Sequence, residues 1–245
     1  MGAVDEARGD GARDLIEVDY EPLPPVMTLE EALAPGAPLV HTVKPQAGHF
    51  PDLAPLRPVL GTNVCHQFHF ERGESGRALG SADLVLDETY SFPPVQHVAL
   101  EAHAAVAVWS EADGLTIWAS TQNPYSVRVE LAKMFGVPLA RIRVVVPHLG
   151  GGFGSKTYAK LEPLTAALAR AAGRPVRLAA SVAEAFQTVR RCSARVHVRV
   201  GFRRDGTLVA VECGADYDVG AYADIGPRVV QKATYTATGP YRVAD

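Results

Sequence analysis

Apolar residues recur along the chain with two different spacings. Segments that alternate apolar and polar residues, or that run through β-branched residues, predict strands, whereas apolar residues three and four positions apart predict helices. Strands are predicted at residues 15–20, 82–92, 95–101, 103–109, 115–120, 141–147, 175–178, 194–201 and 207–217. Helices are predicted at residues 28–35, 124–135, 161–172 and 227–237. This mixture of elements predicts an α+β fold.

Local signals mark the ends of several of these elements. Thr28 and Glu31 form a capping box at the start of the first predicted helix. Asn123 and Pro124 are residues typical of an N-cap and a first helical turn. Asp-Gly pairs favour the positive φ of tight turns and predict two hairpins, at residues 113–114 and 205–206.

The most unusual segment is Gly150–Lys156, called the glycine loop below. It has four glycines in its first five positions and lies between the predicted strand at 141–147 and a predicted helix. Glycine is favoured where the backbone takes positive φ or where bare N–H groups approach a ligand closely. A strand, a glycine-rich loop and a helix N-terminus together predict an anion-binding loop.

Two nucleotide-binding patterns nearly match this loop. The P-loop pattern fits from Gly150 to Thr157, except that Ser155 replaces the second glycine. A P-loop enzyme also needs a later apolar strand ending in Asp, and the run ending at Asp87 comes before the loop. A dinucleotide-binding G-x-G-x-x-G pattern fails at Ser155 too. A P-loop-like nucleotide-binding protein remains an alternative hypothesis.

The composition of the chain indicates which partners and which cellular location to expect. The formal net charge is −3, and Lys and Arg form no basic stripe, so a nucleic-acid partner is not predicted. The three cysteines are far apart and predict neither a metal site nor a disulfide framework. His66 and His69 would point to opposite faces of a strand, which favours packing over metal binding. No stretch predicts a signal peptide or a membrane span, and a cytoplasmic location is expected.

The glycine loop resembles the GGGFGxK signature of the molybdenum hydroxylases, the family of xanthine dehydrogenase, aldehyde oxidase and carbon monoxide dehydrogenase. Further strings resemble those of the family in the same order, at residues 14–24, 63–66, 72–74, 95–103, 120–123, 173–177, 220–224 and 239–242. The resemblance covers nearly the whole chain. It implies a partial hammerhead-type α/β domain followed by the first part of a mixed-sheet molybdopterin-binding domain. The implied boundaries are 1–45 for the hammerhead part, 46–80 for a linker and 81–245 for the molybdopterin-binding part.

The resemblance also implies an activity and its cofactors. The chain is expected to be a fragment of an oxidoreductase large subunit that hydroxylates aldehydes or N-heterocycles with oxygen derived from water. The implied cofactor is a molybdenum–pterin, either molybdopterin or molybdopterin cytosine dinucleotide. [2Fe-2S] clusters and FAD are expected on partner subunits, which would carry electrons away.

Site residues are carried over from the family by position. The residues expected to face the cofactor are Gly151, Gly152, Phe153, Gly154 and Ser155. The family often has a glutamine near the cofactor's apical oxygen, and its position corresponds here to Val95, one residue before the available glutamine, Gln96. Gln96 is therefore a candidate for this role, and Gln122 is a second candidate. Lys156 is interpreted as a structural cation, and Lys232 is placed near the substrate.

One expected part is missing from these 245 residues. The family's general-base glutamate and its further pterin-binding loops would follow a string like the one at 239–242. A complementing C-terminal molybdopterin-binding polypeptide is therefore expected as a partner, and no catalytic residue is assigned here. The alternative hypothesis is a truncated, non-catalytic fragment that acts as an assembly or binding module.

Overall fold

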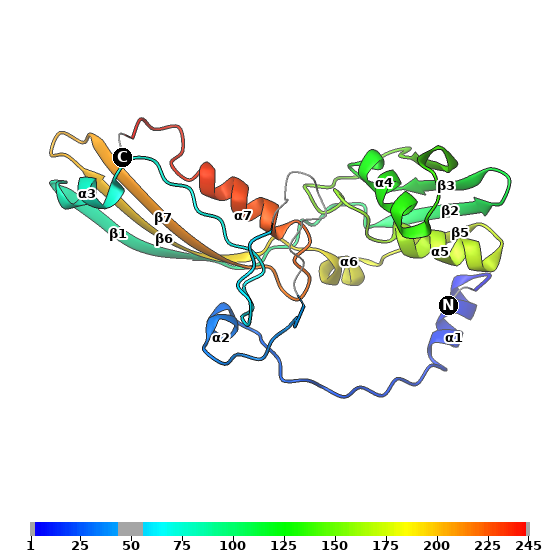
Figure 1. The fold of residues 1–245 in the computed structure, drawn as a ribbon. Coiled ribbons are helices and arrows are strands. Elements are labelled where there is room, and N and C mark those ends of the chain that lie inside the picture. Colours follow the sequence, from blue (N-terminus) through cyan, green and yellow to red (C-terminus); the bar gives the residue numbers. More distant parts are fainter. Residues whose placement is uncertain (1–2, 44–55, 244–245) are drawn as a thin grey trace. The chain divides into compact units, whose positions relative to one another are not determined.

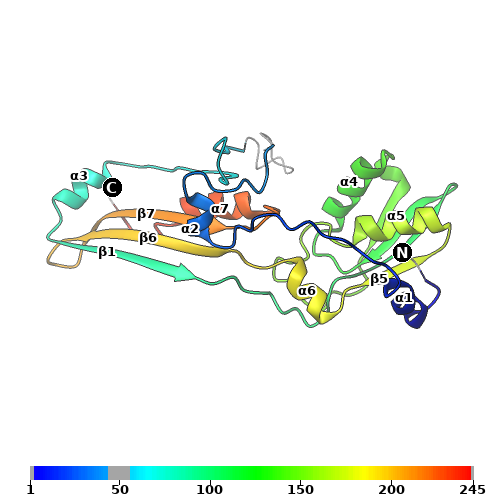
Figure 2. The ribbon, with the colours of Figure 1, turned by 90° about the horizontal axis from the view of Figure 1, so that it is seen from below.

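The computed structural model describes residues 3–43 and 56–243 (Figures 1 and 2). The chain divides into two compact units, each built from two separate stretches. Unit 1 comprises Met1–Glu21 and Gln96–Arg191, and unit 2 comprises Pro22–Val95 and Cys192–Asp245. Both units contain helices and strands, and the α+β prediction is confirmed. The predicted domain boundaries at 45 and 80 stay a prediction, and part of the predicted linker lies outside the described residues.

Unit 1 contains a mixed four-stranded sheet in the order β4-β3-β2-β5. Its strands are β2 (Ala104–Ser110), β3 (Gly114–Ala119), β4 (Ile142–Val145) and β5 (Val176–Ala179). β2 and β3 form the predicted antiparallel hairpin, β3 and β4 run parallel, and β2 and β5 run antiparallel. At the hairpin turn Gly114 has φ 86°, and an added Cβ would lie 2.2 Å from the Arg141 carbonyl oxygen, so only glycine fits there.

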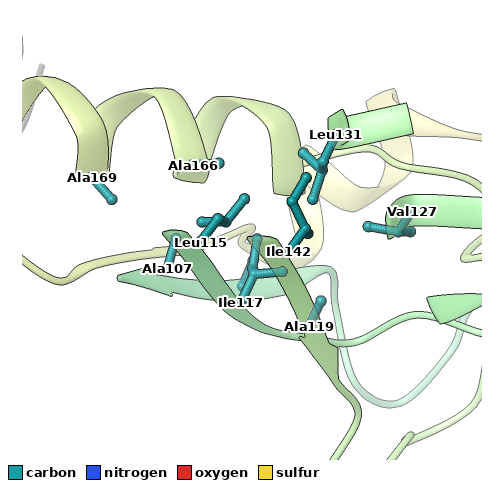
Figure 3. Close-up of a cluster of buried hydrophobic side chains, with 10 residues drawn as sticks. Ala107, Leu115, Ile117, Ala119, Val127, Leu131, Ile142, Ala166 and Ala169 are labelled. Atoms are coloured by element: carbon teal, nitrogen blue, oxygen red, sulfur yellow. The ribbon is translucent and has the colours of Figure 1, made fainter. Parts of the chain in front are cut away.

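Two helices, α4 (Pro124–Phe135) and α5 (Glu162–Ala172), pack on this sheet. The buried core between them is made of small and branched side chains, shown in Figure 3: Ala105, Ala107, Leu115, Ile117, Ala119, Val127, Leu131, Ile142, Ala166 and Ala169. Asn123 caps α4 by accepting a 3.1 Å hydrogen bond from the Ser126 N–H, and Gly136 ends it in the left-handed conformation. The sequence signals for α4 are confirmed. Unit 1 also holds α1 (Glu6–Arg13), α6 (Val182–Thr188) and a short 3-10 turn at Leu139–Arg141.

Unit 2 is built on an antiparallel three-stranded sheet in the order β1-β6-β7. Its strands are β1 (Leu84–Phe92), β6 (Ser193–Phe202) and β7 (Leu208–Asp218). In the described part of this unit the helices are α2 (Leu29–Leu33), α3 (Ser75–Gly80) and α7 (Gly226–Tyr235). The predicted capping box of α2 is present, with the Thr28 side chain and the Glu31 side chain each bonded to the other's backbone N–H.

Two predicted strands are wrong. Residues 15–20 form no strand, and their large apolar side chains are exposed, because no neighbouring strand pairs with them. Residues 95–101 form a single bridge at Val95 and no strand. There the Gln96 side chain accepts a hydrogen bond from the Val98 N–H, and Val98 takes φ 51°, so a local side-chain contact replaces the ladder.

Three short helices were not predicted, namely α1, α3 and α6. The signal for α6 was present, because Ser181 and Glu184 form a second capping box. No helix in the described ranges is long and apolar enough to cross a membrane.

Candidate functional site

The glycine loop follows β4 and lies entirely within unit 1. The helix α5 begins only at Glu162, and residues 157–161 separate it from Lys156. The prediction that the loop leads directly into a helix N-terminus is therefore wrong. Side chains from neighbouring segments hold the loop instead.

Glu101 holds the first residue of the loop. Its Oε2 atom accepts a 2.9 Å hydrogen bond from the Gly150 N–H, and its own backbone N–H donates to the Gly150 carbonyl at 3.1 Å. A Cβ at Gly150 would lie 2.5 Å from the Glu101 Cβ. Glycine is thus required at this position because the Glu101 backbone and side chain pack directly against it.

Lys156, at the other end of the loop, completes an ion pair with the same carboxylate. Its side chain is 1% exposed, and Nζ donates to Glu101 Oε2 at 2.9 Å and to the Glu101 carbonyl at 2.7 Å. The Ser120 hydroxyl donates to Oε2 at 2.6 Å. Burial by itself raises the pKa of Glu101, but the hydrogen bonds from Ser120, Lys156 and Gly150 outweigh it and hold the pKa below its ordinary value. The carboxylate therefore stays charged and joins the loop's two ends.

Gln122 holds the second half of the loop. Its Oε1 atom accepts hydrogen bonds from the N–H groups of Gly154 at 3.0 Å and Lys156 at 3.3 Å. Its backbone N–H donates to the Lys156 carbonyl at 2.8 Å. A Cβ at Gly152 would lie 2.4 Å from the Gln122 Cδ. Glycine is therefore also required at position 152, because the Gln122 side-chain amide packs directly against it.

The tip of the loop carries the remaining donors. Within the described residues, the N–H groups of Gly151, Gly152 and Phe153 meet no acceptor. Gly151 and Phe153 have positive φ, 91° and 52°, and the Phe153 side chain is 73% exposed. The Ser155 hydroxyl donates to the Gly152 carbonyl at 2.8 Å, so it braces the loop from inside. A braced loop thus carries three consecutive backbone donors that no acceptor in the described residues uses.

A buried histidine, His103, forms one further hydrogen bond to the loop. His103 Nε2 donates to the Ser155 carbonyl at 3.2 Å. Burial lowers the pKa of His103, which keeps its imidazole neutral at pH 7. Sequence reasoning had assigned no role to Glu101, Ser120 or His103. The available signal was Glu101 itself, a single charged residue directly after the apolar run 98–100.

The other predicted site residues make none of these hydrogen bonds. Gln96 donates from Nε2 to the Ala185 carbonyl in α6 at 3.1 Å, and its Oε1 accepts from the Val98 N–H, so both ends of its amide are used. Val95 and Lys232 belong to unit 2, Lys232 in the last turn of α7. Within the described residues, no group of three or more His, Cys, Asp or Glu side chains is arranged to hold a metal ion.

Comparison with known proteins identifies the family. The profile of the molybdopterin cofactor-binding domain matches residues 56–245, which is most of the chain. The chain belongs to this family. As a member of the molybdenum hydroxylases, it carries the glycine loop inside the matched region, and the resemblance inferred from the loop is confirmed.

Two relatives show how this molybdenum hydroxylase chain compares in length. It is 31% identical to a probable xanthine dehydrogenase subunit of Bacillus subtilis over 100% of this chain and 31% of that protein. It is 32% identical to the nicotinate dehydrogenase large molybdopterin subunit of Eubacterium barkeri over 96% of this chain and 51% of that protein. The chain thus spans about a third to a half of these relatives.

Solved structures share the fold of this molybdopterin-binding chain. The aldehyde oxidoreductase of Desulfovibrio gigas matches 99% of this chain with a TM-score of 0.84 at 23% identity, over 25% of its own length. Carbon monoxide dehydrogenase from Oligotropha carboxidovorans matches 98% with a TM-score of 0.80 at 25% identity, over 30% of its own length. The mixed-sheet architecture expected from the resemblance is present in the chain.

Proposed function

We propose that this chain is part of a molybdopterin-dependent oxidoreductase that hydroxylates aldehydes or N-heterocycles with oxygen derived from water. In this proposal electrons pass to [2Fe-2S] clusters and FAD on partner chains. The general-base glutamate comes from polypeptide outside these 245 residues. Membership of the family supports the cofactor, and the names of the relatives support the class of reaction.

The observation that carries the proposal is the row of three N–H groups at the tip of the glycine loop. The Glu101 carboxylate and the Gln122 amide take up N–H groups on either side, at Gly150 and Gly154. Once those hydrogen bonds are made, the N–H groups of Gly151, Gly152 and Phe153 have no acceptor within the described residues. Fixed backbone donors bind oxygen atoms that carry negative charge, which fits the oxygens of a molybdenum–pterin.

The residues of the chain have distinct roles in this proposal. When bound, the cofactor supplies the redox centre that accepts two electrons from the substrate. Gly151, Gly152 and Phe153 bind and orient it through their N–H groups, and the exposed Phe153 ring keeps water from that side. Within the described residues, the side-chain amide of Gln122 uses only its oxygen in hydrogen bonds, so its nitrogen can donate to a ligand. Both ends of the Gln96 amide are already bonded. Gln122 is therefore proposed as a cofactor donor ahead of Gln96.

The P-loop hypothesis has less support from the same contacts. A P-loop lysine reaches phosphate oxygens, whereas Lys156 Nζ is buried against Glu101. The N–H groups of Gly154 and Lys156 are taken by Gln122, and no helix starts at the loop.

The experiment is performed on the assembly purified from its source through a tag on this chain. Its molybdenum and pterin contents are measured first. An aldehyde and an N-heterocycle are then supplied with an electron acceptor in ¹⁸O-labelled water. We expect stoichiometric molybdenum and one ¹⁸O atom in the product. Molybdenum without turnover favours the non-catalytic binding module, and a folded assembly without molybdenum contradicts the proposal.

A further inference from the structure

The β1-β6-β7 sheet of unit 2 has one face that is almost entirely apolar. Strand alternation and register place the following residues on this surface, called the apolar face: Leu84, Leu86, Glu88, Tyr90 and Phe92 in β1, Ala194, Val196, Val198, Val200 and Phe202 in β6, and Val211, Cys213, Ala215 and Tyr217 in β7. Glu88 is its single charged member. The face crosses all three strands without interruption.

The opposite face carries the charges of the sheet. His197 and Arg199 both contact Asp87, at 2.6 and 3.2 Å, and Arg199 also contacts Glu212 at 2.8 Å. Two helices of unit 2 are anchored there. Glu30 at the start of α2 pairs with Arg195 at 2.8 Å, and Ser75 of α3 donates to Glu212 at 2.9 Å. The unit's own helices α2 and α3 therefore attach to the polar face.

The apolar face is left open to solvent along β1. Every residue of β1 is exposed, including Leu86 at 49% and Tyr90 at 54%, and Cys213 and Ala215 are exposed in β7. Apolar surface in contact with water costs about 25 cal/mol per Å² relative to burial. A contiguous apolar patch of this kind marks an interaction surface, and the near absence of charge is typical of permanent rather than transient interfaces.

We propose that the apolar face is covered by the part of the molybdenum hydroxylase subunit that these 245 residues do not match. The chain corresponds to 31% of the Bacillus subtilis relative and to 30% of the carbon monoxide dehydrogenase chain, so both have about two thirds of their length left over. That remaining polypeptide, whether joined to the chain or separate, supplies the second apolar layer. The proposal deepens the proposed function, but it depends on family membership and not on the reaction.

Cys213 provides a direct probe because it lies on the apolar face and is a free, exposed thiol. Burial of part of its surface raises the pKa of the thiol, so alkylation is carried out at pH 9. Its labelling rate is compared between the isolated 245-residue chain and the intact source protein or assembly, and Cys65 serves as the internal reference. We expect Cys213 to react at least tenfold more slowly in the intact form.

A matched pair of variants tests the two faces. Leu86→Glu places a charge on the apolar face, and Thr89→Glu places the same charge on the opposite face, across from His197. Circular dichroism is used to check that both variants fold. We expect Leu86→Glu to restore fast Cys213 labelling or to lose the partner polypeptide, and Thr89→Glu to behave like the parent chain.

Three outcomes overturn the proposal. One is equal Cys213 labelling in the isolated and intact forms. Another is protection that arises from a second copy of the chain, seen by sedimentation as a dimer of the isolated chain. The third is an equal effect of the two variants. Molybdenum content is measured in the same samples, which separates the two proposals. Protected Cys213 without molybdenum would contradict only the proposed function, and molybdenum with unprotected Cys213 would contradict only the covered apolar face.

Discussion

Each end of the glycine loop depends on one side-chain oxygen atom that serves several donors. Glu101 Oε2 accepts from Gly150, Ser120 and Lys156, and Gln122 Oε1 accepts from two backbone N–H groups. Charge-assisted hydrogen bonds are the stronger ones, so the Lys156–Glu101 pair is the central contact of the loop.

Replacing Lys156 by Met is expected to destabilise unit 1. The substitution removes the buried cation and leaves the Glu101 carboxylate with fewer donors, at a cost of about 2 kcal/mol in the free energy of unfolding. The Glu101 side chain is 37% exposed, so water recovers part of the loss. The measurement is urea unfolding. As the control, Lys133→Met changes an exposed lysine in α4 and is expected to cost less than about 0.5 kcal/mol. Equal effects of the two substitutions would contradict the role of the ion pair.

Glu162 gives a pH dependence of the opposite sign to that of a paired carboxylate. Burial raises its pKa, and the Glu130 carboxylate nearby adds to the rise, while the hydrogen bond from the Lys160 N–H opposes it. The folded state therefore binds the proton more tightly than the unfolded state. Stability from this group is full below the ordinary glutamate pKa and is lost as the pH rises through the folded-state pKa.

Glu162→Gln is accordingly expected to increase the free energy of unfolding at pH 8 relative to the parent chain. The glutamine oxygen still accepts from the Lys160 N–H, and the buried charge is gone. Urea unfolding at pH 4 and pH 8 measures the effect, with Glu111→Gln in the exposed hairpin turn as the control. A variant that is less stable than the parent chain at pH 8 would show that the carboxylate is stabilised by its surroundings.

At the scale of elements, the sequence was informative wherever a local signal decided the structure. The cap at Asn123 and the turn at Gly114 are set by a side chain and a φ angle, and both were predicted. The extended segment 15–20 has the composition of a strand, but a strand needs a partner that local sequence does not specify. The loop was located from its glycines, whereas the Glu101 and Gln122 contacts join positions 32 to 55 residues apart and required the fold.

At the β2–β3 hairpin turn, the cost of a steric clash can be measured separately from the cost of a positive φ angle. Gly114→Ala adds a Cβ that would lie 2.2 Å from the Arg141 carbonyl oxygen, in addition to the cost of positive φ. Gly136→Ala is the matched control, because Gly136 also has positive φ but faces open space. We expect about 1 kcal/mol for Gly136→Ala and a clearly larger loss for Gly114→Ala in thermal or urea unfolding. Equal losses would mean that the β2–β3 turn relaxes away from Arg141.

At the scale of the whole molecule, the two units contribute different structural features. Unit 1 supplies the braced glycine loop, and unit 2 supplies a sheet with one polar and one apolar face. Both units combine residues from distant parts of the sequence, an organisation that periodicity and composition cannot reveal. The family was predictable because the glycine loop is a compact and specific string, and the match to residues 56–245 confirms it.

The central claim is that the glycine loop binds the molybdenum–pterin, and molybdenum stoichiometry in two glycine variants tests it most directly. In Gly152→Ala the added Cβ would lie 2.4 Å from Gln122 Cδ and displace the loop, whereas in Gly214→Ala it meets nothing within 4 Å. Molybdenum per chain is measured in each purified assembly, with folding checked by circular dichroism. If the loop binds the cofactor, Gly152→Ala is expected to lower molybdenum about tenfold, equivalent to about 1.4 kcal/mol of binding, while Gly214→Ala keeps the parent ratio. A folded Gly152→Ala assembly that retains the parent ratio would contradict it.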